Sequence, residues 1–284
     1  MERRLFYAIY LVAVTAIWLH VLFPSRALRD FAIKAAAGFV PGLSLAVGQV
    51  NFNLPLGVSF GDVTVQYRDA QLSRLERLRL RPEWKTLLPG WAAFSFQTEI
   101  GGGKVRGRVA IETAPVLCLK SLHLELETLQ MAAFPVIFRQ IGREASGLCS
   151  GEVVWDSDRP GAVLEAHLSL ENGRIEIRHP LIKRRSLSFA KIDAEIDMRG
   201  PSLSLRRMVW QGPEIDGEFS GTLQVRSPLE ASQIEIGGEL RPHPIFLTEL
   251  RQTIPERLMP QPDPGGRYGV LFTGTVAKPK YRLR

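Results

Sequence analysis

Hydrophobic and polar residues alternate with a period of two over most of the chain after residue 42. Leu122, Leu124 and Leu126, for example, are separated by polar or charged residues. The same alternation covers residues 43–47, 63–67, 164–170, 175–177 and 192–198. Each segment is predicted as a β-strand with one apolar and one polar face, which is typical of antiparallel sheets. The sequence therefore predicts a mainly β protein with an elongated, twisted antiparallel sheet, either an open groove or a partly closed barrel.

Helical periodicity is confined to a few short segments. Residues 25–39 place Leu28, Phe31 and Ala32 at helical spacing before Pro41 and Gly42, which predicts an amphipathic helix. Shorter helices that cap the sheet are expected within Ser73–Leu88, Phe134–Glu144 and Pro244–Arg257. A proline-rich loop over 259–266 then leads to a last strand around Tyr268–Val276.

The run Leu5–Phe23 contains nineteen residues without Asp, Glu, Lys or Arg. As a helix it would measure about 28 Å, close to the thickness of a bilayer's hydrocarbon core, so it is predicted as a single membrane span. The alternative is a cleaved signal peptide, but the run is longer than a signal core and no small-x-small site follows it. We expect a cytoplasmic tip and anchor over 1–24, a juxtamembrane helix over 25–40 and a periplasmic β domain over 41–284.

A glycine pattern occurs three times with identical spacing. Gly-x-apolar-x-Gly-x-apolar-x-apolar is found as GKVRGRVAI, GLCSGEVVW and GEFSGTLQV. Its glycines are Gly103 and Gly107, Gly147 and Gly151, and Gly217 and Gly221. They share the face of the apolar residues, where a missing side chain relieves crowding in a coiled sheet. The pattern favours a repeated hairpin unit, against a chance recurrence in a glycine-rich β protein.

Catalytic and metal-binding motifs are absent from the sequence. The five histidines form no HExxH or H-x-H motif, and His123 and His167 fall on polar strand faces. No G-x-S-x-G elbow occurs, and the GGGK segment at 101–104 lacks the spacing of a phosphate loop. We therefore expect no enzymatic activity and no cofactor.

The net charge of +7 is mild and spread along the chain. Because no nucleic-acid motif accompanies it, we expect no nucleic acid as partner. Four arginines at 74, 77, 79 and 81 are interpreted as solvated charge. Lys183, Arg184 and Arg185 lie in a predicted turn, where they are either solvated or contact anionic lipid or a partner protein.

The chain has two cysteines, Cys118 and Cys149. Each lies an even number of positions from neighbouring apolar residues of its predicted strand, so both are expected to point inward. An oxidising compartment would allow a disulfide between them, and two buried thiols are the equally weighted alternative.

Several segments together resemble the type II secretion system protein N family, within the broader AsmA-like group of inner-membrane-anchored periplasmic β proteins. They are an early G-L-x-L strand and the stretches LRLRPEWKTLLPGWAAFSFQTEIGGGKVRGRV, LETLQMAAFPVIFRQIGREASGLCSGEV and VRSPLEASQIEIGGELRP. With the N-terminal span they cover nearly the whole chain. The motifs are structural ones, and none is a catalytic signature. The resemblance implies a bitopic inner-membrane component of the machinery that exports folded proteins, with other secretion-system subunits as partners.

Two classes of function fit these observations. The first is a non-enzymatic component that acts in assembly or scaffolding of a type II secretion system. The second is a lipid-binding or lipid-transfer protein that holds phospholipid acyl chains on the apolar face of its sheet. Inward positions either pack on one another or line a channel, and they include Phe94, Phe96, Phe219, Leu223 and Val225.

Overall fold

The computed structural model describes most of the chain beyond residue 24. The described residues are 6, 7, 10, 14, 24–39, 42–53, 57–67, 70–83, 86, 90–112, 118–134, 144–158, 163–176, 186–227, 229–253 and 261–283. Within them, no helix combines the length and the apolar character needed to cross a bilayer. Nearly all of the predicted span Leu5–Phe23 lies outside the described residues, so the span stays a prediction.

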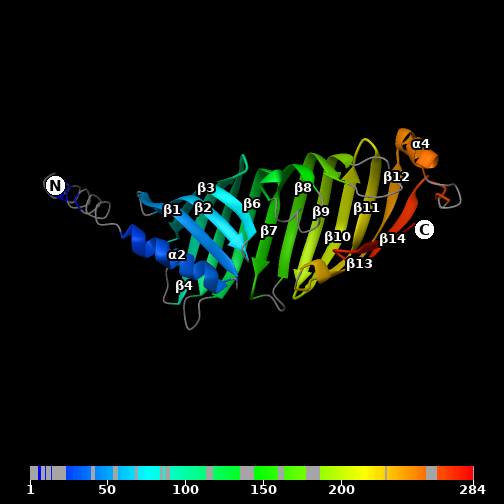
Figure 1. Ribbon diagram of the computed structural model, residues 1–284. Helices are drawn as coiled ribbons and strands as arrows, with labels where there is room; N and C mark the ends of the chain where they lie inside the picture. Colours follow the sequence, from blue (N-terminus) through cyan, green and yellow to red (C-terminus); the bar gives the residue numbers. More distant parts are fainter. Residues whose placement is uncertain are drawn as a thin grey trace. The chain divides into compact units, whose positions relative to one another are not determined.

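Fourteen antiparallel strands form one sheet, and their order in the sheet is their order in the chain (Figure 1). The elements are α2 (Ser25–Phe39), β1 (Leu43–Asn53), β2 (Gly57–Tyr67), β3 (Ala70–Pro82), β4 (Trp91–Ile100), β5 (Gly103–Glu112), β6 (Cys118–Gln130), η2 (Met131–Ala133), β7 (Ala145–Asp156), β8 (Val163–Glu176), β9 (Ser186–Arg199), β10 (Ser202–Gln211), β11 (Ile215–Gln224), η3 (Leu229–Ala231), β12 (Gln233–Pro242), α4 (Pro244–Thr253), β13 (Tyr268–Thr275) and β14 (Pro279–Leu283). The prediction of a mainly β, antiparallel protein with a few short helices is confirmed.

The chain divides into two compact units. The first comprises Met1–Glu99 with Ala110–Cys118, and the second comprises Ile100–Val109 with Leu119–Arg284. Strand β5 contributes residues to both units. Each unit is therefore treated by itself below.

The core of the first unit lies on one face of β1 to β3. Its buried residues are Val47, Phe60 and Val63, of which Val63 is only 1% exposed. Helix α2 covers this core, since Ala32 and Ile33 pack against it. The predicted helix over residues 25–39 is thus confirmed, although its Phe31, expected on the inward face, is 66% exposed.

The alternation of β2 and β3 changes phase at Asp62. This residue has φ 50°, in the left-handed region that a non-glycine residue seldom adopts. On β2 the buried residues Phe60 and Val63 are three positions apart, and on β3 the packed leucines Leu75 and Leu78 have the same spacing. In both strands, the set of side chains that faces the core therefore shifts by one residue, and it does so at paired positions of the two strands.

The prediction of a helical turn within Ser73–Leu88 is confirmed only near the end of that segment. Residues 70–82 form strand β3, paired with β2 and β4. A 3-10 turn follows at Thr86, whose backbone N–H donates a 2.9 Å hydrogen bond to the carbonyl oxygen of Glu83. The spacing of three between Leu75 and Leu78 imitates a helix. It arises here from the irregularity beside Asp62, whose carboxylate also receives a 2.9 Å hydrogen bond from Arg74.

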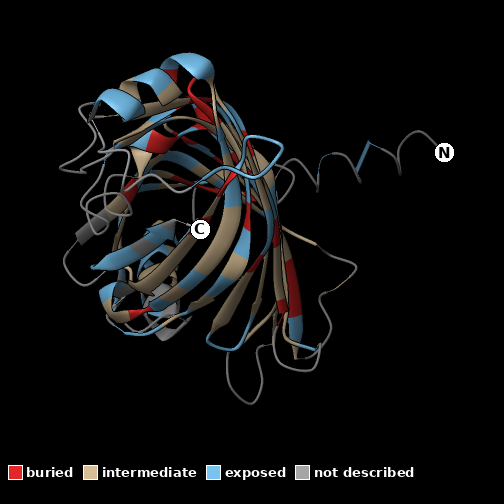
Figure 2. Cartoon of the chain, turned by 90° about the vertical axis from the view of Figure 1, so that its right-hand side faces the viewer, coloured by how far each residue is buried: buried red, intermediate tan, exposed pale blue. Residues whose placement is uncertain are grey.

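The second unit contains β6 from Leu119 onward, all strands from β7 to β14, and most of β5. The pairing register shifts on β6 between Leu126 and Leu129, on β7 between Ser146 and Leu148, and on β10 between Leu205 and Met208. Bulges increase the local twist and bend of a strand, and Figure 2 shows the strands of this unit as bent ribbons.

The helices predicted near the end of the chain are confirmed in part. Helix α4 begins at Pro244, as expected, and the last long strand spans Tyr268–Thr275. Most of the predicted helix over Phe134–Glu144 lies outside the described residues. The described chain just before it contains the short helix Met131–Ala133.

A candidate hydrophobic binding face

One face of the second unit is apolar over eight strands. The residues that oppose each other from β6 to β13 form four rows, and we call these rows together the apolar face. The first row is Leu126, Gly151, Leu168, Ala194, Met208, Phe219, Gly238 and Val270, and the second is Leu124, Val153, Ala166, Ile196, Leu205, Gly221, Ile236 and Phe272. The third is Leu122, Trp155, Leu164, Met198, Leu203, Leu223, Ile234 and Gly274, and the fourth is Leu129, Cys149, Leu170, Ile192, Trp210, Gly217, Leu240 and Tyr268. No row contains a charged residue.

Burial differs between the two sides of the apolar face. The fourth row includes the buried residues Leu129, Ile192 and Tyr268, at 3%, 2% and 7% exposure. All eight residues of the third row remain only half-buried. Figure 2 shows buried residues as short separate segments among strands that are otherwise of intermediate or high exposure. The apolar face is therefore packed at one side and accessible at the other.

A hydrophobic cluster closes the packed side. Met131, Phe189 and Ile192 are its buried members, and Trp210 packs against them. The rings of Phe189 and Trp210 meet edge to face with centroids 5.6 Å apart. Short helix η2 supplies Met131, so the end of β6 folds over this side of the sheet. In the first and second rows, Phe219 and Phe272 pack with ring centroids 6.4 Å apart.

Three of the repeat glycines, Gly151, Gly217 and Gly221, lie in the rows of the apolar face. Gly151 and Gly221 have φ 153° and 157°, and a Cβ atom on either would overlap a carbonyl oxygen of the next strand. Gly151 pairs with Leu126 of β6, and Gly221 pairs with Leu205 of β10. Each of these leucines is the last residue before a bulge. The second and third copies of the pattern therefore have the same local structure: a glycine opposite a bulge.

Three of the other repeat glycines, Gly103, Gly147 and Gly217, also lie close to backbone or aromatic atoms. A Cβ atom on Gly103 would lie 2.6 Å from the carbonyl oxygen of Glu127, and one on Gly217 would lie 2.9 Å from the Phe219 ring. Gly147 has φ 135° and approaches Gly173 of β8. Gly107 lies half-buried in β5. The copies lie within strands β5, β7 and β11, and only the first directly follows a tight turn.

The opposite face of the second unit is charged. Glu125, Glu152, His167, Glu195 and Arg207 oppose one another across β6 to β10. Arg207 Nε donates a 2.8 Å hydrogen bond to Glu218 Oε1, and Arg267 Nη1 donates one of 2.8 Å to Glu239 Oε2. Because these charged groups are exposed, water can solvate this face, whereas burial of the apolar face away from water is favourable.

Two of the three histidines with described positions, His123 and His243, lie beside carboxylates. His123 Nδ1 lies 3.4 Å from Glu152 Oε1, and His243 Nε2 lies 3.0 Å from Asp216 Oδ2. The hydrogen bond with His243 holds the pKa of Asp216 below its ordinary value. Among the described residues, no group of three His, Cys, Asp or Glu side chains is arranged to hold a metal ion.

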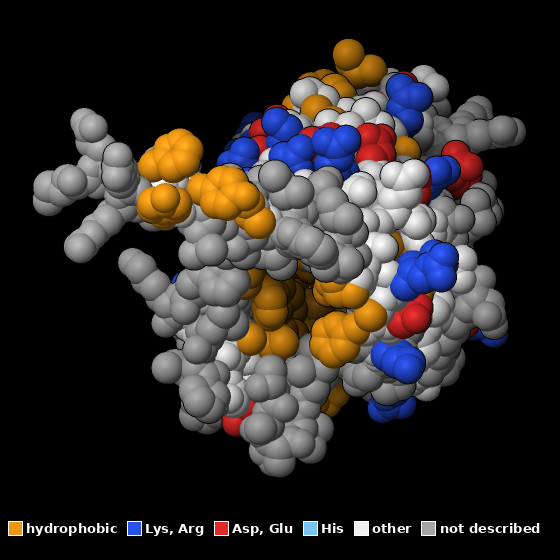
Figure 3. Space-filling view, turned by 90° about the vertical axis from the view of Figure 1, so that its left-hand side faces the viewer, with side chains coloured by type: hydrophobic (Ala, Val, Ile, Leu, Met, Phe, Trp, Pro, Cys, Tyr) orange, Lys and Arg blue, Asp and Glu red, His pale blue; other side chains and the backbone are white. Residues whose placement is uncertain are grey.

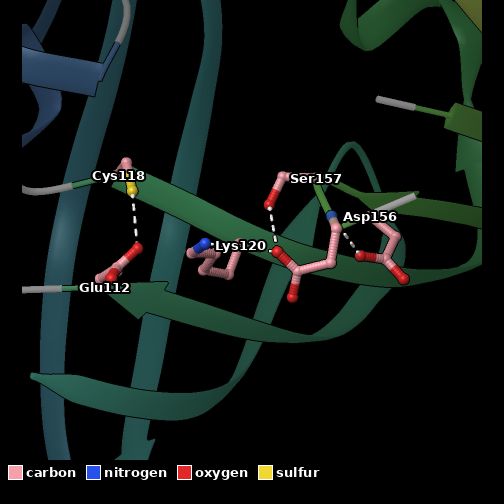
Figure 4. Close-up of polar contacts among 6 residues, drawn as sticks. Glu112, Cys118, Lys120, Asp156 and Ser157 are labelled. Atoms are coloured by element: carbon pink, nitrogen blue, oxygen red, sulfur yellow. Dashed lines mark hydrogen bonds and ion pairs between the residues drawn. The ribbon is translucent and has the colours of Figure 1, made fainter. Parts of the chain in front are cut away.

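The two cysteines are not joined by a disulfide bond. Cys118 is exposed at the start of β6, and its thiol donates a 3.5 Å hydrogen bond to Glu112 Oε2 (Figure 4). Cys149 lies half-buried on β7, opposite Leu129 near the other end of β6. Burial raises the pKa of the Cys149 thiol. The expectation that both point inward thus fails for Cys118, and the structure does not bring the pair together.

Other predicted positions fall in different places. Lys183, Arg184 and Arg185 lie outside the described residues. In the first unit, Phe94 opposes Pro82 and Phe96 opposes Leu80, a residue that packs on the core. Seen from the end at which β1 lies, the surface is hollowed, and the side chains visible in the hollow are hydrophobic (Figure 3). In the second unit, Phe219 and Leu223 belong to the apolar face, and Val225 directly follows β11.

Comparison of the chain with protein-family models, with curated proteins and with solved structures gives no match. The resemblance to the type II secretion system protein N family therefore rests on the sequence motifs alone.

Proposed function

We propose that this protein is a non-enzymatic, membrane-anchored carrier that holds the hydrocarbon chains of lipids on the apolar face of its second unit. The observation that carries the proposal is the set of four uninterrupted apolar rows across β6 to β13, of which the third is half-buried along its whole length. An accessible apolar surface of this extent is typical of a binding site for an apolar ligand.

The dimensions of the apolar face suit a long hydrocarbon chain. Neighbouring strands lie about 4.8 Å apart, so eight strands span roughly 34 Å along a row. One leaflet of a bilayer contributes about 15 Å of hydrocarbon thickness. A row therefore has room for an extended acyl chain that runs across the strands, and half-buried leucine, isoleucine and methionine side chains can follow its contour.

The predicted membrane anchor gives such a site its source of lipid. Leu5–Phe23 would span the inner membrane of a Gram-negative cell with the N terminus in the cytoplasm. Helix α2, which follows that run after Pro24, packs against the first strands of the sheet through Ala32 and Ile33. The sheet would then begin at the periplasmic surface of the membrane, and phospholipid is the ligand that this location favours.

Native mass spectrometry of the full chain, released from membranes into a mild detergent, tests the proposal. We expect co-purified phospholipid in the unaltered protein, and loss of most of it in Ile236→Asp, which places a carboxylate in the second row. Thr222→Asp, on the exposed face of β11, is the matched control and should retain the lipid. Absence of lipid from the unaltered protein, or equal loss in both variants, would contradict the proposal.

A second candidate is the assembly role in a type II secretion system, and the sheet edge favours it. Strand β14 is the last in the order of strands and pairs with β13 alone within the described chain. Such an edge can accept a strand from another subunit. A photoreactive residue in place of the exposed Arg282 should then capture a secretion-system subunit in intact cells, and capture of lipid alone would exclude this role.

A further inference from the structure

Three arginines line the polar face of β3 in the first unit. Arg77, Arg79 and Arg81 alternate with Leu78 and Leu80, which pack against the core on the opposite face. Residues two positions apart on a strand are about 6.6 Å apart. The three side chains therefore project from the same face of β3 and form one row, which we call the arginine ridge.

The ridge is exposed and has no carboxylate bound to it. All three arginines are exposed, and none of their guanidinium groups forms an ion pair or a hydrogen bond within the described part of the chain. Other arginines of the same protein do have partners. Arg74 on the same strand binds Asp62 at 2.9 Å, and in the second unit Arg207 binds Glu218 at 2.8 Å.

The strands beside the ridge offer mostly uncharged polar groups. Arg79 opposes Ser59 of β2 and Gln97 of β4, and Arg81 opposes Ser95. The one acidic residue directly opposite the ridge is Glu99, which faces Arg77. Like charges about 6.6 Å apart lie within one Debye length at physiological ionic strength, so they repel each other until an anion binds.

From this arrangement we propose that the arginine ridge is a docking site for an extended acidic segment of a partner protein, with Asp or Glu at every second position. A β-like peptide presents alternate side chains with the same spacing of about 6.6 Å, so successive carboxylates can each meet one guanidinium group. The regular spacing of the ridge favours such a peptide, because lipid head groups have no fixed spacing that would match it. This inference is independent of lipid binding by the second unit.

The ligand for the test is a synthetic eight-residue peptide of alternating Glu and Thr. Binding to the full chain in zwitterionic nanodiscs is measured by fluorescence anisotropy at low and at physiological salt. We expect binding that weakens with salt. A peptide of the same composition with its four glutamates contiguous should bind several-fold more weakly, because its charges do not match the spacing of the ridge.

A pair of triple variants tests the site itself. Arg77→Gln, Arg79→Gln and Arg81→Gln together should weaken peptide binding by about tenfold or more, as expected for the loss of three charge-assisted contacts. The control replaces Arg106, Arg207 and Arg267, which have ion-pair partners, by Gln and removes the same charge. This control should change the affinity by less than about twofold.

Three results would overturn the inference: equal loss of affinity in both triple variants, no preference for the alternating peptide, or no peptide binding at all. A fourth is measured with vesicles that contain phosphatidylglycerol. If the ridge variant loses binding to these vesicles while peptide binding is unchanged, the ridge is a lipid contact and the proposed partner is wrong.

Discussion

The backbone carbonyl of His167 occupies the space that a Cβ atom on Gly151 would need. Gly151 lies on β7 and His167 on the neighbouring β8, and Gly221 has the same relationship to the carbonyl of Glu235 on β12. Both glycines stand opposite a bulge in the preceding strand. The two sites therefore maintain the close strand approach on which the apolar face depends.

Gly151→Ala and Gly221→Ala should each destabilise the protein by about 3 kcal/mol, because a Cβ atom would clash with backbone and the positive φ adds strain. Urea unfolding followed by circular dichroism measures the change. Gly237→Ala is the matched control, since its Cβ atom would meet only Leu271 at 3.8 Å. Equal stability of the three variants would show that the close approach is not needed.

The sequence alone could predict these glycines and the crowding that they relieve, but not the strand register around them. The repeated spacing placed Gly151 and Gly221 on the apolar face, and the structure has them there. The bulges opposite them appear in the sequence only as a spacing of three between apolar residues, from Leu126 to Leu129 and from Leu205 to Met208. Such a spacing does not by itself show where the extra residue lies or which strand is opposite. The register of the strands also depends on such bulges, so the four rows could not be drawn from alternation alone.

Local spacing was misleading at two other places. Leu75 and Leu78 imitate a helical turn, but their spacing follows from the change of phase at Asp62. Phe31 fits the apolar stripe of α2 by sequence, yet Ala32 and Ile33 make the contact with the core. In both cases tertiary packing, which lies beyond a local pattern, decides which side chain is buried.

Phe189→Ala should lower the free energy of unfolding by about 3 to 5 kcal/mol, since the ring is 2% exposed and packs edge to face on Trp210. Tryptophan fluorescence during urea unfolding measures the change. Phe31→Ala removes an equally large ring that is 66% exposed and should shift the value by at most about 0.5 kcal/mol. A similar loss in both variants would contradict the assignment of the packed side of the face.

The pair formed by Asp216 and His243 should make stability depend on pH. A carboxylate whose pKa is lowered in the folded state stabilises the fold above its unfolded pKa, near 3.9, and loses this contribution as the pH falls through the folded value. Asp216→Asn should therefore cost stability at pH 7 and almost none at a pH below the folded-state pKa. Because both side chains are more than a third exposed, we expect a cost below about 1 kcal/mol.

Urea unfolding at several pH values measures this dependence on Asp216. Glu235→Gln, on an exposed position without an ion pair in the described chain, is the charge-matched control and should show a smaller effect. A stability difference between Asp216→Asn and the unaltered protein that persists unchanged into acid would contradict the role of the hydrogen bond.

The two thiols should react with iodoacetamide at different rates. Cys118 is exposed and should be modified first, whereas burial raises the pKa of Cys149 and reduces its thiolate fraction. Mass spectrometry of the native protein over time should show one rapid addition and one slow addition. In unfolded, unreduced protein both thiols should react, and failure of both to react would reveal a disulfide between them.

Photo-crosslinking at two adjacent residues of β12 tests lipid binding most directly. Ile236 belongs to the second row of the apolar face, and Glu235 lies exposed on the opposite face. A benzoylphenylalanine at each position is irradiated in cells whose phospholipids carry radioactive phosphate. We expect the label to become attached to the protein from position 236 and not from position 235. No label from position 236, or equal label from both positions, would show that the apolar face does not hold lipid.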